Sequence, residues 1–437
     1  MNSINISGIL RNLLTYSWDF DIIIFNKTYS KKGEDMRSTG IICEYNPIHM
    51  GHIRQIEYAR ASGADVIVCI MSGNYTQRGE FAIADKYTRA KAAIKAGADV
   101  VFELPFPFSS MSAEFFANAG VYILSKLGVN EICFGHECHD IEILKQVSDI
   151  ITNESFIEKL NSKGALGNAK GFFDAFKEAS GLDYTLGSND ILAAYYLAAI
   201  KKHAPEMNIL PILRNGASYN EKNLLDGILP SANAIRNVVY KSGSFDSVPC
   251  DNIPLSAKDV LSEAEQNGLA PVLSKNVSNE ILSFFRLLSP EDIKNRASSL
   301  SGGDTVLDDG NGIIERLCSS AKGSSFLDEM LSNAYNSKFT NSRMNRVLLF
   351  SLFGVSNTMK NTLPEYTTLL ASSRVGREFL SSIRKSATIK IITKPADAPR
   401  ESVQYKISAL SDGLYATAIP KKKTSTYFSY LSPYIEN

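Results

Sequence analysis

The chain has 437 residues, of which 44% are hydrophobic and 21% are charged, and its 46 basic side chains balance its 46 acidic ones. This length suits two or three domains with ample core, and the composition is that of an ordinary globular protein. The zero net charge excludes a surface that binds nucleic acid all over, and no apolar run is long enough to span a membrane. We expect a cytoplasmic protein with no membrane partner, and the six scattered cysteines agree with a reducing compartment.

The first 37 residues differ in character from the rest of the chain. They contain the single tryptophan, Trp18, and lack the cationic start, compact apolar stretch and cleavage site of a signal peptide. Met36 lies just before the first expected strand. We therefore expect residues 1–37 to be an extension without function that reflects an upstream start.

Residues 38 to 135 alternate between apolar runs and helical patterns. The apolar runs predict buried parallel strands at 39–43, 65–71, 99–104 and 130–134. The helical patterns between them lie at 50–62, 83–97 and 112–127, and each is followed by a glycine where a left-handed residue ends a helix: Gly63, Gly97 and Gly128. This alternation predicts right-handed βαβ units and an α/β fold with a doubly wound, Rossmann-like parallel sheet.

The pattern changes along the rest of the chain. Ser188 opens a further helix, 209–213 is an expected strand, and Ser231 is placed to cap a helix that carries Arg236 about one turn on. From about 250 the chain is mainly helical. Residues 338–437 hold fifteen Lys and Arg against six Asp and Glu, a net charge of +9. We predict a catalytic domain at 38–245 and a basic, mainly helical, RNA-binding portion at 246–437.

Four polar loops come directly after the expected strands, at their carboxyl ends. They are the loop around His49, Ser72–Arg78, Glu103–Pro105 and Gly135–Glu137. Ligands of doubly wound sheets bind at that edge. The sequence therefore predicts one site there.

The most informative stretch is His49-Met-Gly-His52, at a turn from a strand into a helix. A helix N-terminus presents unpaired N–H groups and a positive dipole, which favour phosphate. Gly51 lets the backbone approach a nucleotide, and two imidazoles can stabilise the charge on a transferring α-phosphate. The layout is typical of nucleotidyl transfer, with His49, Gly51 and His52 as catalytic residues.

His-x-Gly-His on a strand, loop and helix resembles the HIGH-type nucleotidyltransferase superfamily. Longer stretches resemble one family within it, the bacterial tRNA(Met) cytidine acetate ligases: Glu44 to His52, Ser72 to Glu80, Asp85 to Arg89, Val101 to Pro105, Asn189 to Leu192 and Arg214 to Tyr219. The resemblance covers about 38 to 437 and is densest in the first half.

The resemblance implies a two-step ligation that uses ATP. On general grounds we expect Mg²⁺ to bridge the ATP phosphates, and no protein ligand is assigned to it. Acetate forms acetyl-adenylate and pyrophosphate, and the N4 amine of the wobble cytidine in elongator tRNA(Met) then takes the acetyl group. The implied nucleotide contacts are Ile42, Cys43, Glu44, Tyr45, Asn46, Pro47, Ile48, Met50, Ile53, Arg54, Gln55, Gly135, Asn189 and Arg214. Ser231 and Arg236 resemble a second phosphate-binding motif that would hold pyrophosphate.

Two positions depart from the family pattern. His136 stands where Ser is usual, which puts a bulkier side chain near the nucleotide, and Asp190 stands in place of Asn, which adds a negative charge. Arg78 is expected to contact phosphate or RNA. Lys86 and Arg89 could also reach phosphate or RNA, and a solvated helix face is the simpler interpretation of both.

The candidates for RNA binding lie in the basic C-terminal portion. Lys421, Lys422 and Lys423 are the main ones, and the arginine and lysine pairs 343/346, 374/377 and 384/385 accompany them. Tyr427, Phe428 and Tyr430 could stack on bases. Two alternatives remain open: a nucleotidyltransferase for a small phosphorylated substrate of the pantetheine or nicotinate type, and a non-catalytic RNA-binding protein.

Overall fold

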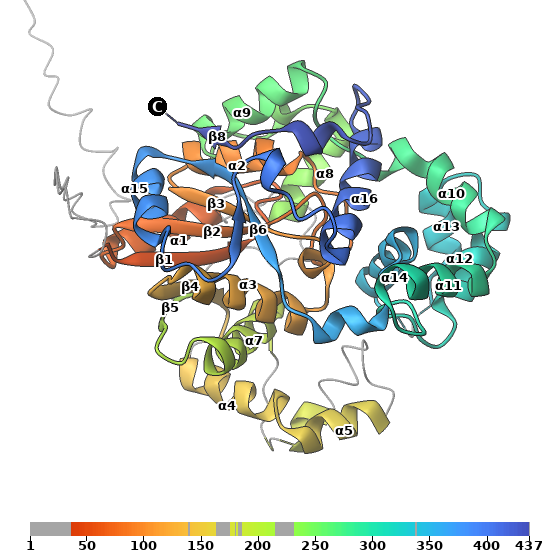
Figure 1. The fold of residues 1–437 in the computed structure, drawn as a ribbon, viewed down its shortest axis with the longest axis horizontal. Coiled ribbons are helices and arrows are strands. Elements are labelled where there is room, and N and C mark those ends of the chain that lie inside the picture. The colour runs from red at the N-terminus through yellow and green to blue at the C-terminus, as the bar shows by residue number, and fades with distance from the viewer. Residues whose placement is uncertain are drawn as a thin grey trace, which may run out of the picture.

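The computed structural model describes residues 36–138, 140–162, 175–179, 181, 186–214, 231–336 and 339–436. A single mixed sheet lies at its centre, with strand order β5-β4-β1-β2-β3-β6-β7 and β8 paired to β6 (Figure 1). The strands are β1 (Ser38–Cys43), β2 (Val66–Ser72), β3 (Val100–Leu104), β4 (Glu131–His136), β5 (Asn208–Leu213), β6 (Tyr366–Ser372), β7 (Lys390–Ile392) and β8 (Tyr434–Ile435).

The first five strands run parallel and confirm the predicted Rossmann-like arrangement. β2 and β3 are buried along their whole length, as expected for strands covered on both faces. The strand order reverses at β1, because β2 and β3 extend the sheet in one direction whereas β4 and β5 extend it in the other. A crevice at the carboxyl ends of β1 and β4 is therefore the expected ligand position.

Helices cover both faces of this sheet. On one face, Val66, Val68 and Ile70 of β2 pack into the same core as helix α3. On the other face, the alternate residues Ile67, Cys69 and Met71 pack into the core with α1, α2, α8 and α9. The helices up to this point are α1 (Met50–Ala61), α2 (Lys86–Lys95), α3 (Ala113–Leu127), α4 (Ile141–Ile151), α5 (Glu154–Ser162), α7 (Ser188–His203), α8 (Ala232–Ser242) and α9 (Leu255–Gln266).

The C-terminal portion contributes both helices and strands. Its helices are α10 (Ser278–Leu287), α11 (Pro290–Ser301), α12 (Ile313–Lys322), α13 (Leu327–Ala334), α14 (Asn341–Phe353), α15 (Arg374–Ile383) and α16 (Val403–Ala418). Helices α10 to α14 form a group beside the sheet (Figure 1). β6 pairs antiparallel with β3 and continues the central sheet. The central sheet thus includes strands from beyond residue 245, the predicted end of the catalytic domain. That domain boundary stays a prediction.

Capping residues and glycines mark the ends of the first helices. Asp85 caps α2 by accepting from Tyr87 N and Thr88 N, so this helix begins later than the predicted residue 83. Gly63, Gly97 and Gly128 all have positive φ, as predicted. Within the described ranges, no helix is both long and apolar enough to cross a membrane.

Candidate active site

A cavity of about 220 Å³ opens at the carboxyl ends of β1 and β4, where the strand order reverses. Fourteen of the residues predicted for the site line it: Ile42, Cys43, Glu44, Tyr45, Asn46, His49, His52, Gln55, Arg78, Gly135, Asn189, Arg214, Ser231 and Arg236. The predicted residues outside the lining are Pro47, Ile48, Met50, Gly51, Ile53, Arg54 and Lys421 to Lys423. The four predicted loops are thus only partly brought together, because no residue of Glu103–Pro105 reaches this cavity.

The two imidazoles stack at the start of α1. Their ring centroids are 3.7 Å apart, and the ring of Tyr45 packs edge-on against His52 at 4.9 Å. His49 is the N-cap residue, and its Nδ1 accepts from Gly51 N at 3.1 Å. His49 N donates in turn to Nδ1 of His52 at 3.2 Å, which completes a capping box built from two histidines. The helix start itself therefore fixes both rings.

This hydrogen bonding also fixes the tautomers. An Nδ1 that accepts a hydrogen bond leaves the proton of a neutral imidazole on Nε2. Burial lowers the pKa of His49 to about 3, and the charges of Arg214 and Arg236 contribute to this lowering. Burial, with His49 and Arg214 nearby, also lowers the pKa of His52. Both residues are therefore neutral at physiological pH, and each offers an Nε2–H donor in the lining of the cavity.

Gly51 and Asn46 shape the loop around the imidazoles. A Cβ on Gly51 would lie 2.9 Å from Cε1 of His49, so a side chain there would displace the ring. Asn46 is buried, and its Oδ1 accepts from Ile83 N at 2.7 Å. Its Nδ2 has no hydrogen-bond partner among the described residues although it is buried. A buried amide donor in the lining of a cavity suits a ligand that supplies the missing acceptor.

Helix α8 brings the predicted second phosphate motif to the same cavity. Ser231 caps α8 as predicted, and its Oγ accepts from Ala234 N at 3.1 Å. Arg236 is buried on the first turns of α8 and donates to Asn46 O at 2.9 Å, and its Nη2 lies 3.2 Å from Oε2 of Glu80. A helix N-terminus and a guanidinium therefore lie together at this cavity, an arrangement that favours phosphate.

The strand ends of β4 and β5 supply a further wall. Gly135 allows the side chain of Arg214 to cross it, because a Cβ there would lie 2.8 Å from Cδ of Arg214. Arg214 N donates to His136 O at 2.8 Å, which continues the strand pairing to the edge of the site. Asn189, on the first turn of α7, lines the cavity and its amide bonds to the Glu137 carboxylate.

The structure explains both departures from the family pattern. The carboxylate of Asp190 is buried and accepts from three backbone N–H groups, those of Glu137, Cys138 and Gly187, at 2.7 to 2.9 Å. It therefore joins the loop after β4 to the start of α7. The expectation that His136 approaches the nucleotide is wrong, since His136 lies outside the cavity lining and its Nδ1 is 2.7 Å from Cys138 O.

Arg89 is not on a solvated helix face, contrary to our expectation. It is 1% exposed, and its guanidinium donates to the backbone carbonyls of Glu44, Ser72, Gly73 and Ala84. Three of those carbonyls belong to the loops that leave β1 and β2 or to the end of β2 itself. Gln77 N donates to Glu44 Oε1 at 2.8 Å, so the second loop is tied to the first. Arg89 is thus a buried side chain that holds the loops after β1 and β2 together beneath the site.

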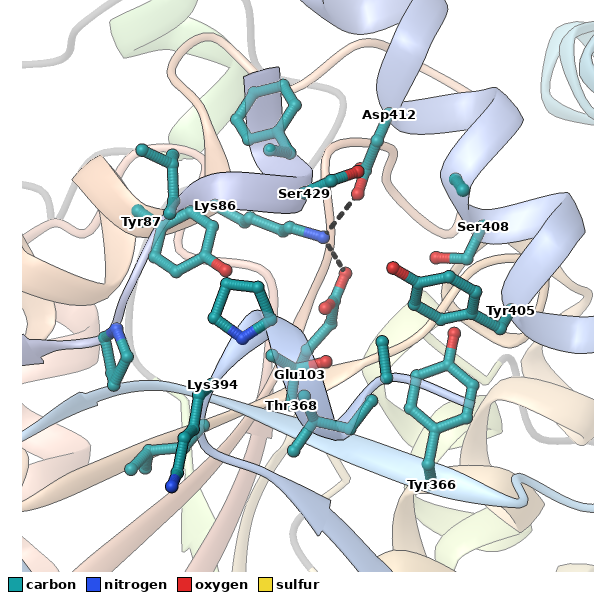
Figure 2. Close-up of a pocket in the computed structure, with 18 of the residues that line it drawn as sticks. Lys86, Tyr87, Glu103, Tyr366, Thr368, Lys394, Tyr405, Ser408, Asp412 and Ser429 are labelled. Atoms are coloured by element: carbon teal, nitrogen blue, oxygen red, sulfur yellow. Dashed lines mark hydrogen bonds and ion pairs between the residues drawn. The ribbon is translucent and has the colours of Figure 1, made fainter. Parts of the chain in front are cut away.

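The expectation for Lys86 is wrong in the same way (Figure 2). Its Nζ lies 2.7 Å from Glu103 Oε1 and 2.7 Å from Asp412 Oδ2, and the ammonium is buried. Burial alone would lower the pKa of Lys86, but the two carboxylates outweigh it and hold that pKa well above its usual range. Asp412 belongs to α16 and also accepts from Asn74 Nδ2 at 2.8 Å. The group therefore joins the C-terminal portion to the loop that carries Gln77 and Arg78.

The predicted RNA-binding residues divide into two sets. Lys421 and Lys422 are exposed, and Nζ of Lys422 lies 3.8 Å from Glu280 Oε1. Tyr430 is 74% exposed, whereas Phe428 is buried against Tyr415 and cannot stack on a base. Arg346 is also buried, paired with Asp308 at 2.6 Å, so it is not a surface charge. Residues 1–35 and Asn215 to Tyr219 of the quoted motif lie outside the described residues.

Eight lining residues were not predicted from the sequence: Gln77, Ala113, Phe116, Phe134, Ser188, Leu192, Tyr196 and Ala232. Gln77 and Leu192 lie inside quoted motifs and Ser188 lies directly before one, which was the available signal. Phe116 and Tyr196 come from the faces of α3 and α7, and an apolar helix face gives no sign of which residues reach a cavity. In the described part of the chain, no group of three or more His, Cys, Asp or Glu could hold a metal ion.

The fold and this site define a class, which comparison with known proteins confirms. Residues 36–428 match the family described as HIGH Nucleotidyl Transferase, to which the chain belongs. Among curated proteins, the tRNA(Met) cytidine acetate ligase of Acetivibrio thermocellus is 33% identical over 83% of this chain and 89% of its own length. The enzyme of the same name from Clostridium perfringens is 32% identical over 92% of this chain and 100% of its own. The chain is therefore a member of the tRNA(Met) cytidine acetate ligase family, a family of ligases.

Solved structures agree with this assignment. The apo form of Thermotoga maritima TmcAL superposes with a TM-score of 0.81 at 27% identity, and the match covers 92% of this chain and 100% of that one. The same protein bound with alpha-thio ATP superposes with a TM-score of 0.78. A relative of this fold thus binds an ATP analogue.

Proposed function

We propose that this protein activates acetate with ATP as acetyl-adenylate and transfers the acetyl group to N4 of the wobble cytidine of elongator tRNA(Met). One observation carries the proposal: two neutral imidazoles, fixed by a capping box, offer Nε2–H donors in a cavity that also contains Arg236 and the buried amide of Asn46. Donors fixed before the reaction stabilise developing phosphate charge without reorganisation. The names of the relatives support the acceptor.

In the first step a carboxylate oxygen of acetate attacks the α-phosphorus of ATP, and the bond to the β-phosphate oxygen breaks. His49 and His52 donate to the phosphate oxygens while the negative charge increases there. Arg236 and the N-terminus of α8 hold the leaving pyrophosphate. Because both histidines are held neutral, they act as hydrogen-bond donors and not as acids.

In the second step the N4 amine attacks the acyl carbon of acetyl-adenylate. AMP leaves with the electron pair of the broken bond to the phosphate oxygen, and the amine loses a proton. The exposed Lys421 and Lys422 support contact with the tRNA backbone. We assign Arg78, which lines the cavity, to the nucleotide or the RNA.

The test measures label from acetate in RNA. The protein is incubated with labelled acetate, ATP and bulk tRNA, and the RNA nucleosides are separated to identify N4-acetylcytidine. His52→Ala removes one donor and should slow acetyl-adenylate formation by about 100-fold. His203→Ala is the matched control, because His203 lies on α7 and bonds Asn118 outside the cavity. Absence of labelled cytidine with the unmodified protein, or full activity in His52→Ala, would refute the proposal.

A further inference from the structure

A second cavity, of about 410 Å³, adjoins the nucleotide cavity. Arg236 lines both cavities. One wall comes from the catalytic side, with Gly79 to Phe81 and helix α8. The opposite wall comes from the C-terminal helices α13 and α14, and the turn at 273–275 closes one end. The two parts of the chain therefore build this cavity together, and it meets the site of adenylation at Arg236.

The lining of the second cavity suits a nucleobase. Its walls include six apolar side chains, beside the polar Ser274 and Asp328: Phe81, Leu273, Leu327, Leu331, Leu348 and Leu349. Tyr240 adds an aromatic ring, while Asn233 and Asn345 supply amide donors and acceptors. Lys275 lies at the same cavity and suits a backbone phosphate. Single-stranded bases are bound by apolar and aromatic walls with polar groups for the base edge, and the volume falls in the range of about 300–1,000 Å³ typical of ligand pockets.

Glu80 lies at the junction of the two cavities. It lines the second cavity, and its Oε2 is 3.2 Å from Nη2 of Arg236. Arg236 also donates to the backbone of Asn46 in the nucleotide cavity, and its charge acts on the imidazole of His49. The Glu80 side chain is 38% exposed, so a carboxylate oxygen can be approached from the second cavity.

We propose that the second cavity receives the acceptor cytidine and that Glu80 takes the proton from its N4 amine. This inference rests on the proposed function and adds the acceptor subsite and the base. After pyrophosphate has left, the N4 amine attacks the acyl carbon of acetyl-adenylate. The C–N bond forms, the bond from the acyl carbon to the AMP oxygen breaks, and AMP leaves with that electron pair. The N4 proton passes to the Glu80 carboxylate, so the step needs no other reagent.

The first test separates the two half-reactions in Glu80→Gln. Acetate-dependent exchange of pyrophosphate into ATP reports adenylation without RNA, and a single turnover with tRNA reports transfer. Loss of a general base should slow transfer by about 100- to 1,000-fold. The ratio of transfer to exchange should fall by about the same factor. Glu401→Gln, whose side chain is 99% exposed, is the matched control.

Two results would overturn the role of Glu80. An equal fall of exchange and transfer would show that Glu80 only orients Arg236, and unchanged rates of both would show that no base acts there. A failure of the proposed function itself is distinguishable, because the unmodified protein would then show no acetate-dependent exchange.

The second test fills the cavity without touching Glu80. Leu331→Trp places a larger side chain on the α13 wall, and Leu287→Trp is the control because Leu287 is 81% exposed on α10 and outside the cavity. We expect the KM for tRNA to rise at least tenfold in Leu331→Trp relative to Leu287→Trp. Equal KM values in two variants that retain exchange activity would contradict the placement of the cytidine.

Discussion

Replacing Lys86 by Met should destabilise the protein strongly, although the ammonium takes no part in the proposed chemistry. The side chains of Lys86, Glu103 and Asp412 are only 5%, 3% and 15% exposed. Lys86→Met leaves two carboxylates facing each other without a counter-charge. Breaking a buried ion pair by removal of one partner costs about 3–5 kcal/mol, so we expect the free energy of unfolding to fall by about 4 kcal/mol.

The loss of stability in Lys86→Met should depend on pH, and the pKa of Glu103 sets the direction of that dependence. Burial raises the pKa of Glu103 even in the presence of Lys86, and loss of the ammonium must raise it further. A carboxyl group whose pKa is higher in the folded state than in the unfolded state binds more protons when folded, so the fold gains stability as pH falls through the folded pKa. The deficit of Lys86→Met should therefore shrink as the pH falls.

Urea unfolding monitored by far-ultraviolet circular dichroism measures both effects. Lys91→Met is the matched control on the same helix, since Lys91 pairs with Glu263 at the surface and should contribute less than about 1 kcal/mol. A loss below about 1 kcal/mol in Lys86→Met, or a loss that is independent of pH, would refute the reasoning.

The loops around the nucleotide cavity give two further predictions. The pKa of His49 is lowered to about 3 in the folded protein, whereas it is near 6.5 in the unfolded chain. The unmodified protein should therefore lose stability as the pH falls from 7 to 5, and His49→Asn should reduce that loss in the free energy of unfolding by about 2 kcal/mol. Equal pH dependence in the unmodified protein and the variant would disprove the burial argument. Gly79→Ala should destabilise the protein and raise the KM for ATP, because Gly79 has φ +72 and its Cβ would lie 2.6 Å from the backbone N of Arg346. Gly128→Ala is the control, with φ +74 and open space around its Cβ, and both should lose about 1–2 kcal/mol from the left-handed conformation. A loss in Gly79→Ala no larger than in Gly128→Ala would contradict the clash.

Much of the fold and site could be predicted from sequence because the signals are local. The apolar runs of β1 to β4 alternate along the chain with helical patterns, and this alternation predicts strands that run parallel to one another. Helices α1 and α8 begin at His49 and Ser231, and the start of a helix depends on only a few neighbouring residues. The edge of the sheet at which the loops meet is set by the same alternation.

The predictions that failed share one cause: they depend on contacts between residues that are far apart along the chain. β6 pairs with β3, yet more than 260 positions separate Phe102 from Leu369 and nothing local identifies that partner. Lys86 and Arg89 have the spacing of a solvated helix face, and only the return of α16 and the neighbouring loops buries them.

The sequence by itself determined the class of the protein, the sheet and the helix start that fixes the two imidazoles, because hydrophobic period and capping act over a few residues. Tertiary structure alone decided which charges are buried, where the C-terminal portion meets the catalytic sheet and that a second cavity adjoins Arg236. These features depend on which distant segments pack together, and burial of a charge is set by its partners and not by its neighbours in the chain.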